Sequence, residues 1–166
     1  MSGHPGREER LTWLAVGALT ALALILRLDH FLGPLNGDEI STAYIVDGNS
    51  LGGVLSDLSS DAEISPPLYF LAAWAATKLG SAPELIRLPS LIAGVASIPL
   101  VFLVGRKAVS AAAGLIAAAV MTLTPFMIFY SGDGRTYAVV IALLLGSTLA
   151  LLHAASVKAA RSYRYE

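Results

Sequence analysis

Long runs of apolar residues dominate the chain, and their length restricts it to a membrane fold. Three runs cover residues 11–32, 108–130 and 137–157, and a fourth covers residues 86–104. About 20 helical residues cross the hydrocarbon core of a bilayer, so each run can form a span. The composition agrees, because 55% of the residues are hydrophobic and only 14% are charged. We therefore predict an all-α integral membrane protein with four transmembrane helices.

A fifth apolar run, residues 66–80, is too short for a comfortable span. Pro66-Pro67 favours the start of a helix, and Tyr69 and Trp74 carry rings that are common at headgroup level. If this run crossed the membrane, every later segment would face the opposite side of the membrane. The sequence therefore predicts a helix that lies in the outer interface.

The positions of lysine and arginine predict which side each segment faces. Loops on the cytoplasmic side of a membrane protein are rich in lysine and arginine. The basic residues that flank the spans are therefore assigned to that side: Arg7, Arg10, Arg106, Lys107, Lys158, Arg161 and Arg164. The expected organisation is a cytoplasmic terminus at 1–10, a membrane part at 11–157 and a cytoplasmic tail at 158–166. A long outer loop at 33–83 holds the interfacial helix.

Two classes of function lose support from composition. The chain has no cysteine, which excludes a disulfide framework and a thiolate metal site. A formal net charge of −1 gives no electrostatic support for a nucleic-acid partner.

With the predicted topology, most acids fall on the outer side: Asp38, Glu39, Asp47, Asp57, Asp61, Glu63, Glu84 and Asp133.

Asp38 and Glu39 are the first catalytic candidates, because they follow the outer end of the first span. A carboxylate near low dielectric gains basicity, which suits a general base acting on a substrate held in the bilayer. Two structural alternatives remain open. Asn36-Gly37 is typical of a solvated turn, and Asp38 could be the N-cap of a helix that starts near Glu39.

Asp133 and Arg135 lie in a short turn between two uncharged runs, where ionisable residues are costly and usually functional. The brevity of the turn makes the last two spans antiparallel neighbours, so Asp133 is expected near Asp38. Asp133 is a further catalytic candidate, and the planar fork of Arg135 suits a lipid phosphate. The alternative is that the two residues simply pair within the turn.

Arg87 is a candidate for a second phosphate contact, with a flanking anchor paired to Glu84 as the alternative. The sequence does not settle the metal requirement. Asp61 and Glu63 could help to hold a divalent cation, but isolated loop acids are more often solvated.

An ordered set of short motifs carries a family resemblance. The motifs are Asn36-Gly37-Asp38-Glu39 with Tyr44, Ser65-Pro66-Pro67-Leu68-Tyr69-Phe70, Arg87-Leu88-Pro89-Ser90, and Tyr130 to Ala138 after Pro125. In this order they resemble the amino-terminal region of the membrane-embedded GT-C glycosyltransferases of the protein O-mannosyltransferase type, which include the bacterial aminoarabinose transferases. The resemblance covers residues 11–157.

The resemblance implies a transferase that moves a sugar from a polyprenyl-phosphate donor to an acceptor glycan, lipid or protein. Such an enzyme would be integral to the bacterial plasma membrane, with its active site facing outward. Asp38 resembles the acid of the first outer loop that acts on the acceptor. Arg135 and Tyr137 match a Glu-Ala-Arg-x-Tyr pattern in which Asp133 replaces the glutamate. Tyr44 and Arg87 complete the expected substrate-binding set.

Two departures limit what the resemblance implies. Many relatives have histidine or another polar ligand where this chain has Ser65, which weakens a metal site. Family members are also several times longer, so the chain is expected to be a fragment or a truncated relative.

The alternative function is a non-catalytic membrane module that binds lipid-linked sugar or a partner subunit. A secondary transporter fits less well, because the acids gather in outer loops and not at the midplane.

Overall fold

The computed structural model describes residues 5–60 and 66–162, and these are helical with no strand. The fold class predicted from the apolar runs is therefore confirmed. The helices are α1 (Pro5–Leu32), α2 (Gly37–Val46), α3 (Leu51–Leu58), α4 (Pro67–Thr77), the 3₁₀ helix η1 (Pro83–Arg87), α5 (Leu88–Ala108), α6 (Ala111–Leu123), α7 (Pro125–Gly132) and α8 (Tyr137–Ser162).

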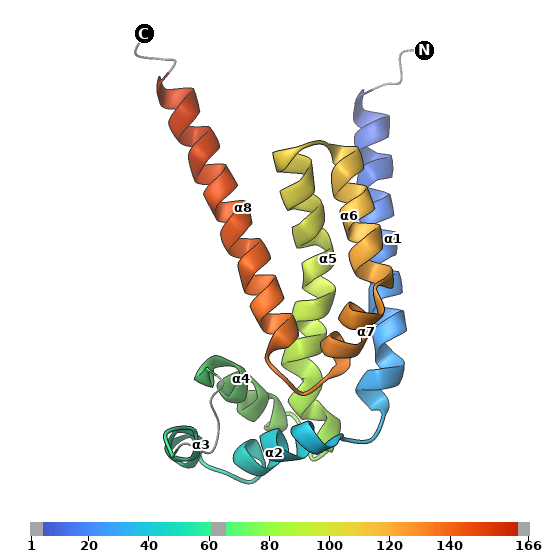
Figure 1. The fold of residues 1–166 in the computed structure, drawn as a ribbon. Helices are drawn as coiled ribbons and strands as arrows, with labels where there is room; N and C mark the ends of the chain where they lie inside the picture. The colour runs from blue at the N-terminus through green and yellow to red at the C-terminus, as the bar shows by residue number, and fades with distance from the viewer. Residues whose placement is uncertain (1–4, 61–65, 163–166) are drawn as a thin grey trace.

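The long helices α1, α5, α6 and α8 run along one bundle (Figure 1). Three segments are long and apolar enough to cross a membrane, namely Gly6–Leu32, Pro83–Ala108 and Tyr137–Val157. The α6–α7 pair qualifies as a fourth if it counts as one broken span. The start of α1 and the end of α8 lie at the same end of the bundle, as an even number of crossings requires.

The fourth span is bent where Pro125 interrupts it. α6 and α7 meet at an angle of 62°, because proline has no N–H for the helical ladder and its ring clashes with the preceding turn. Proline at the start of α7 thus explains the break in this span. By contrast, α5 continues through Pro99 as one helix.

Helices α2, α3 and α4 lie across the opposite end of the bundle from the start of α1 (Figure 1). We call this the crosswise end. Its helices share a small core of their own: Ile45, Val46, Val54, Tyr69, Phe70, Ala73 and Ile86. The described parts of the predicted loop at 33–83 are therefore largely helical, while residues 61–65 lie outside the described residues.

The short apolar run at 66–80 forms α4, which is not among the candidate spans. Its aromatic side chains hold the crosswise helices together. Tyr69 is 2% exposed, and its hydroxyl donates to the Ile86 carbonyl at 2.8 Å. The Trp74 indole N–H donates to the Asn49 carbonyl at 2.9 Å. Tyr69 is thus a buried contact and not an exposed headgroup anchor, because the fold supplies a partner for its hydroxyl.

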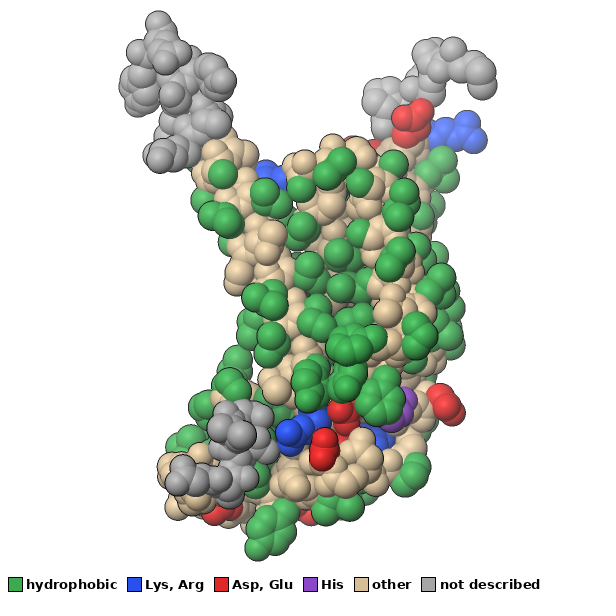
Figure 2. Space-filling view, in the orientation of Figure 1, with side chains coloured by type: hydrophobic (Ala, Val, Ile, Leu, Met, Phe, Trp, Pro, Cys, Tyr) green, Lys and Arg blue, Asp and Glu red, His purple; other side chains and the backbone are tan. Residues whose placement is uncertain are grey.

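The membrane-like bundle carries its apolar side chains outward as well as inward. A core between α1, α5 and α6 contains Val16, Ala23, Ile98, Phe102 and Ala118. Apolar side chains also cover the visible face of the bundle (Figure 2). α8 packs mainly on α5, which leaves Leu143, Leu144 and Leu151 exposed. An outward apolar surface of this extent is typical of helices that face lipid.

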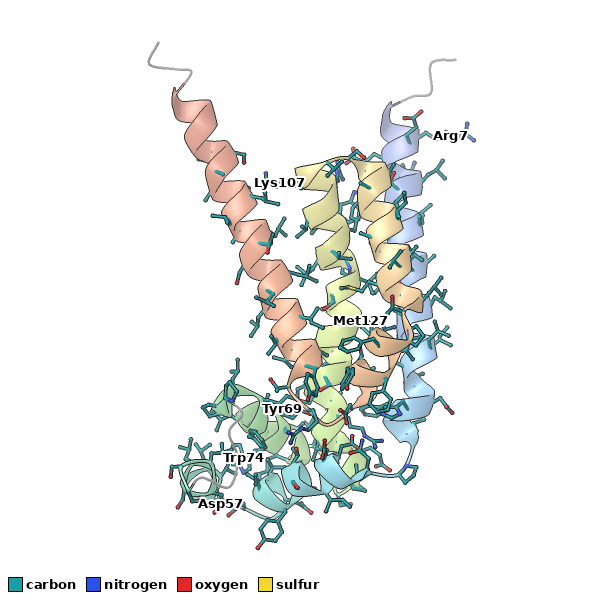
Figure 3. The ribbon with its side chains drawn as sticks, in the orientation of Figure 1. Arg7, Asp57, Tyr69, Trp74, Lys107 and Met127 are labelled. Carbon is teal, nitrogen blue, oxygen red and sulfur yellow. The ribbon has the colours of Figure 1, made fainter. Side chains whose placement is uncertain are left out.

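Charged side chains lie at both ends of the bundle (Figure 2). Arg7 and Lys107 lie at the end where α1 starts, while Asp57 lies at the crosswise end (Figure 3). The basic flanks identified in the sequence for α1 and for the α5–α6 turn therefore share one end of the molecule.

Candidate functional site

The first turn of α2 is fixed by a reciprocal capping box between Asn36 and Glu39. The Glu39 N–H donates to the Asn36 side-chain oxygen at 3.1 Å, and the Asn36 N–H donates to Glu39 Oε2 at 2.8 Å. Asn36 is thus the N-cap, and the alternative that Asp38 caps this helix is corrected. The reason is that the helix begins at Gly37, which places Asp38 within the first turn.

Glu39 is fully buried and accepts hydrogen bonds from three parts of the chain. Besides Asn36, the Gly134 N–H donates to Oε1 at 2.6 Å, and Arg87 donates to both oxygens at 2.5 and 2.6 Å. Burial by itself raises the pKa of this carboxyl, but the hydrogen bonds from Arg87, Asn36 and Gly134 outweigh it and lower the pKa. Glu39 is therefore a buried carboxylate that joins α2, η1 and the 133–136 turn.

Arg87 is also fully buried, and all its donor groups have partners. Nη1 donates to the carbonyls of His30, Phe31 and Gly33 at 2.7–2.9 Å, and Nη2 donates to Pro34 at 2.8 Å. Carbonyls that follow the last turn of a helix lack helical donors and carry partial negative charge. Arg87 therefore caps the end of α1 and pairs with Glu39. The alternative that Arg87 pairs with Glu84 is corrected.

The turn at residues 133–136, here called the polar turn, meets the start of α2. Asn36 Nδ2 donates to Asp133 Oδ1 at 3.1 Å, and the Gly134 N–H reaches Glu39. A Cβ added at Gly134 would lie 3.1 Å from Glu39 Oε1 and Cγ, so glycine permits this close approach. Two segments about 97 residues apart in sequence thus converge, as the short turn led us to expect.

Asp133 is 4% exposed, and its pKa is raised. Desolvation by burial is the main cause, and the nearby Glu39 carboxylate adds to it. The hydrogen bond from Asn36 and the charges of His30 and Arg135 act in the opposite direction. The polar turn therefore holds a carboxyl that binds a proton more tightly than an ordinary aspartate does.

Arg135 is half-buried beside α4 and α5. Its N–H donates to the Asp133 carbonyl at 2.8 Å, and its own carbonyl accepts from Ser90 Oγ at 2.8 Å. The Ser90 hydroxyl also lies 3.3 Å from the Tyr69 hydroxyl. This chain of contacts fixes the backbone of the polar turn against α5 and α4.

The remaining candidates lie on the surface of the crosswise end. Asp38 is exposed in the first turn of α2. Tyr44 is 85% exposed on the same helix, and Tyr137 is 44% exposed where α8 begins. The Tyr137 ring packs against Tyr130, with 4.5 Å between the centroids. These three side chains are accessible from outside, unlike Glu39 and Arg87.

Sequence reasoning missed several residues that build the site, chiefly Asn36, Ser90, His30 and Arg27. A readable signal existed for Asn36, since an Asn three residues before a Glu is a capping-box pattern. Arg27 and His30 are polar residues inside the first apolar run, which was the available signal for them. Ser90 was named only as part of the Arg87-Leu88-Pro89-Ser90 motif, and its contact with the Arg135 carbonyl depends on the chain returning 45 residues later.

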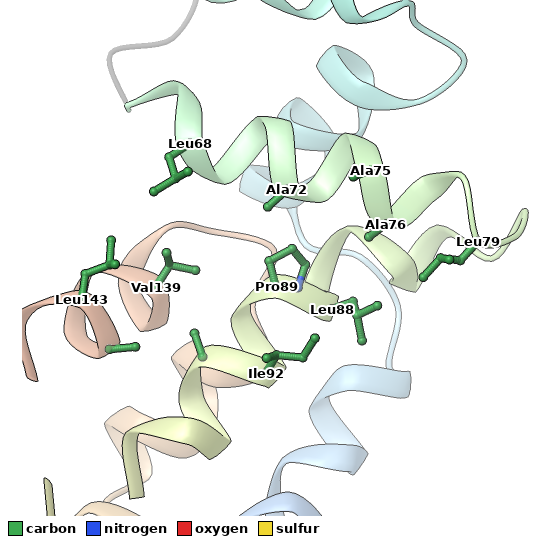
Figure 4. Close-up of a pocket in the computed structure, with 12 residues that line it drawn as sticks. Leu68, Ala72, Ala75, Ala76, Leu79, Leu88, Pro89, Ile92, Val139 and Leu143 are labelled. Carbon is green, nitrogen blue, oxygen red and sulfur yellow. The ribbon is translucent and has the colours of Figure 1, made fainter. Parts of the chain in front are cut away.

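An apolar groove of about 620 Å³ opens beside the polar turn (Figure 4). Its walls come from α4, α5 and the first turns of α8: Leu68, Ala72, Ala75, Ala76, Leu79, Leu88, Pro89, Ile92, Ala93, Val139, Ala142 and Leu143. The polar turn leads directly into the α8 wall, and Arg87 directly precedes the α5 wall. The walls of the groove are therefore close in sequence to the polar turn and to Arg87, although neither lines it.

No cluster of three or more histidine, aspartate or glutamate side chains suited to a metal ion occurs within residues 5–60 and 66–162. Asp61 and Glu63, the acids suggested for a divalent cation, lie outside the described residues.

Comparison with known proteins gives one family match. The family model described as dolichyl-phosphate-mannose-protein mannosyltransferase matches residues 65–165. The match includes Arg87, Asp133, Arg135 and Tyr137, whereas Asp38 precedes it. No curated protein and no solved structure matches the chain.

Proposed function

The chain belongs to the dolichyl-phosphate-mannose-protein mannosyltransferase family, and from this membership we propose that it acts in sugar transfer from a polyprenyl-phosphate donor. The observation that carries the proposal is the apolar groove that opens beside the polar turn. A lipid-linked sugar needs both environments, because its isoprenoid tail is apolar and its phosphate and sugar are polar.

We assign the groove to the isoprenoid tail of the donor. Its volume falls within the range of about 300–1,000 Å³ that is usual for ligand sites, and its lining is apolar. The donor phosphate would then lie at the end of the groove near Arg135, whose planar guanidinium can bind two phosphate oxygens. Exposed Tyr44 and Tyr137 offer rings against which a sugar can pack at the crosswise end.

Asp38 is the proposed general base. Its carboxylate would take the proton of the acceptor hydroxyl as that oxygen bonds to C1 of the sugar. The bond between C1 and the phosphate oxygen breaks in the same step, and its electron pair leaves with the lipid phosphate. Arg135 would stabilise the charge on the leaving phosphate, and attack opposite to it inverts the anomeric centre.

Asp133 is the proposed second carboxyl of the site. Burial raises its pKa, so this carboxyl holds a proton more tightly than an ordinary aspartate does. It could therefore donate a hydrogen bond to the phosphate or sugar at the polar turn. Glu39 and Arg87 are better suited to positioning than to contact with substrate, because donors and acceptors of the chain already surround both groups.

The test measures binding of a polyprenyl phosphate to the purified protein in nanodiscs, with two matched variants. Ala93→Phe fills the groove. The control is Ala119→Phe, which adds the same ring at another half-buried alanine, in a different apolar hollow on α6. We expect Ala93→Phe to weaken binding about tenfold or more, a loss of about 1.4 kcal/mol, and Ala119→Phe to leave it unchanged.

A transfer assay with polyprenyl-phosphate mannose separates enzyme from binding module. Transfer that is lost in Ala93→Phe supports the glycosyltransferase. Binding without transfer by the wild-type protein would favour the non-catalytic module. Equal binding by both phenylalanine variants would remove the groove from the donor site.

A further inference from the structure

A buried arginine near the end of α1 contacts the place where the fourth span breaks. Arg27 on α1 is 0% exposed. Its Nη2 donates to the Met121 carbonyl at 3.3 Å, and Nη1 contacts the Thr122 carbonyl at 3.5 Å. Nη1 also donates to the Ala23 carbonyl of its own helix at 2.9 Å. A charge at membrane depth is costly unless it has such partners, so these contacts call for an explanation.

The break in the α6–α7 span supplies that explanation. In a continuous helix the Met121 carbonyl would accept from the N–H of residue 125, four positions later. Residue 125 is proline and has no N–H, so this carbonyl loses its helical donor. In lipid, freed backbone groups must be satisfied within the protein. The guanidinium of Arg27 supplies the missing donor to Met121 and reaches the next carbonyl as well.

The same face of α1 also holds the far end of α7. His30 lies three residues after Arg27, which places both on one side of the helix. Its ring lies 4.5 Å from the Phe129 ring, centroid to centroid. A Cβ added at Gly132 would lie 2.8 Å from His30 Cδ2, so α7 ends in close contact with α1. Asp133 follows at once and reaches Asn36.

We propose that Arg27 is a positioning residue for the polar turn. It supplies the hydrogen-bond donors that Pro125 cannot, and so holds the bent span at the angle that brings Asp133 to the start of α2. This role goes beyond the proposed sugar transfer and does not depend on it.

Peptide-resolved hydrogen exchange in nanodiscs tests the proposal. Arg27→Met keeps an apolar side chain of similar length but no donor, and Pro125→Ala restores an N–H that can serve the Met121 carbonyl. We expect Arg27→Met to speed exchange in residues 126–134 by about tenfold or more, because a buried carbonyl left without a donor destabilises its segment. Exchange in α3, which packs on α2 and α4, should stay as in the wild type. In the Pro125→Ala background, the effect should shrink to less than about threefold.

Several outcomes would overturn the proposal. They are unchanged exchange at 126–134, an effect spread evenly over the whole chain, or an equal effect with and without Pro125. Arg106→Met, at the opposite end of the bundle, is the control and should leave 126–134 unaffected. If Arg27→Met does not fold, recovery of folding by Pro125→Ala supports the proposal, and failure to fold in both backgrounds refutes it.

Discussion

Replacing Arg87 with methionine should destabilise the protein far more than the same replacement at Arg106, although each arginine pairs with a glutamate. The Arg87–Glu39 pair is fully buried, with both side chains 0% exposed. The Arg106–Glu9 pair spans 3.2 Å at the other end of the bundle, with side chains 39% and 58% exposed. Methionine keeps an apolar side chain and removes every donor, so the comparison sets a buried, fully hydrogen-bonded pair against an exposed one.

The expected magnitudes follow from the contacts. Removing one partner of a buried ion pair costs roughly 3–5 kcal/mol, because the other charge stays buried without compensation. Arg87→Met also leaves the carbonyls of His30, Phe31, Gly33 and Pro34 without this donor. We therefore expect the upper part of that range. An exposed pair such as Arg106–Glu9 contributes about 0–1 kcal/mol.

Glu39→Gln gives the second arm of a double-mutant cycle. It removes the charge but leaves Arg87 its four carbonyl acceptors, so the expected loss is about 1.5–3 kcal/mol. The double variant should lose less than the sum of the two single variants, by roughly 1 kcal/mol or more.

Unfolding by SDS from mixed micelles, followed by tryptophan fluorescence, provides the free energies. A loss in Arg87→Met no greater than that in Arg106→Met would refute the reasoning, as would additive losses in the cycle.

The same pair predicts a direction for the pH dependence of stability. The folded-state pKa of Glu39 is lowered, so the unfolded chain binds the proton more tightly. The stabilisation is therefore fully present above the ordinary glutamate pKa of about 4.3 and is lost as the pH falls through the lower folded value. The stability gap between wild type and Glu39→Gln should accordingly narrow in acid. A constant gap would contradict the ionised state of Glu39 in the fold.

Three further predictions concern topology and the site. In the cysteine-free chain, Ser56→Cys should react with an impermeant maleimide from outside intact cells and Lys107→Cys only after permeabilisation; labelling of both from one side would contradict the topology. Asp38→Asn should lower sugar transfer by roughly 10²–10⁴, while Asp57→Asn changes it little, and equal rates in the two would exclude Asp38 as the base. Arg135→Lys should weaken binding of polyprenyl phosphate, because a single ammonium loses the two-oxygen fork; unchanged affinity would place the phosphate elsewhere.

Run length was enough to predict the membrane part of the fold. A span needs a minimum number of apolar residues, and that number can be counted along the chain. α4 was predictable in the same way, since its run is too short to cross. Proline position was less informative, because Pro99 and Pro125 both lack an N–H, yet α5 continues through Pro99 while the fourth span breaks at Pro125.

The buried pair of the site could not be predicted, because it joins residues 48 positions apart. Asp38 and Glu39 are adjacent acids with the same local signals, yet one is exposed and the other fully buried. Which of the two turns inward depends on the helical phase of α2, and the Asn36 cap sets that phase. The capping pattern was present in the sequence, but its partner Arg87 becomes visible only when η1 packs beneath α2.

Arg27 and Arg87 show why a charge near a membrane site does not by itself indicate a ligand. Both guanidinium groups are fully buried, and both donate to backbone carbonyls where a helix ends or breaks. Such carbonyls have no water to accept from inside a bilayer, so a chain with a broken span and helices packed across its end needs donors of this kind. Arginine suits the task because its five N–H groups can serve several carbonyls at once. That demand accounts for two of the arginines closest to the site, so their burial is explained by the fold without a ligand.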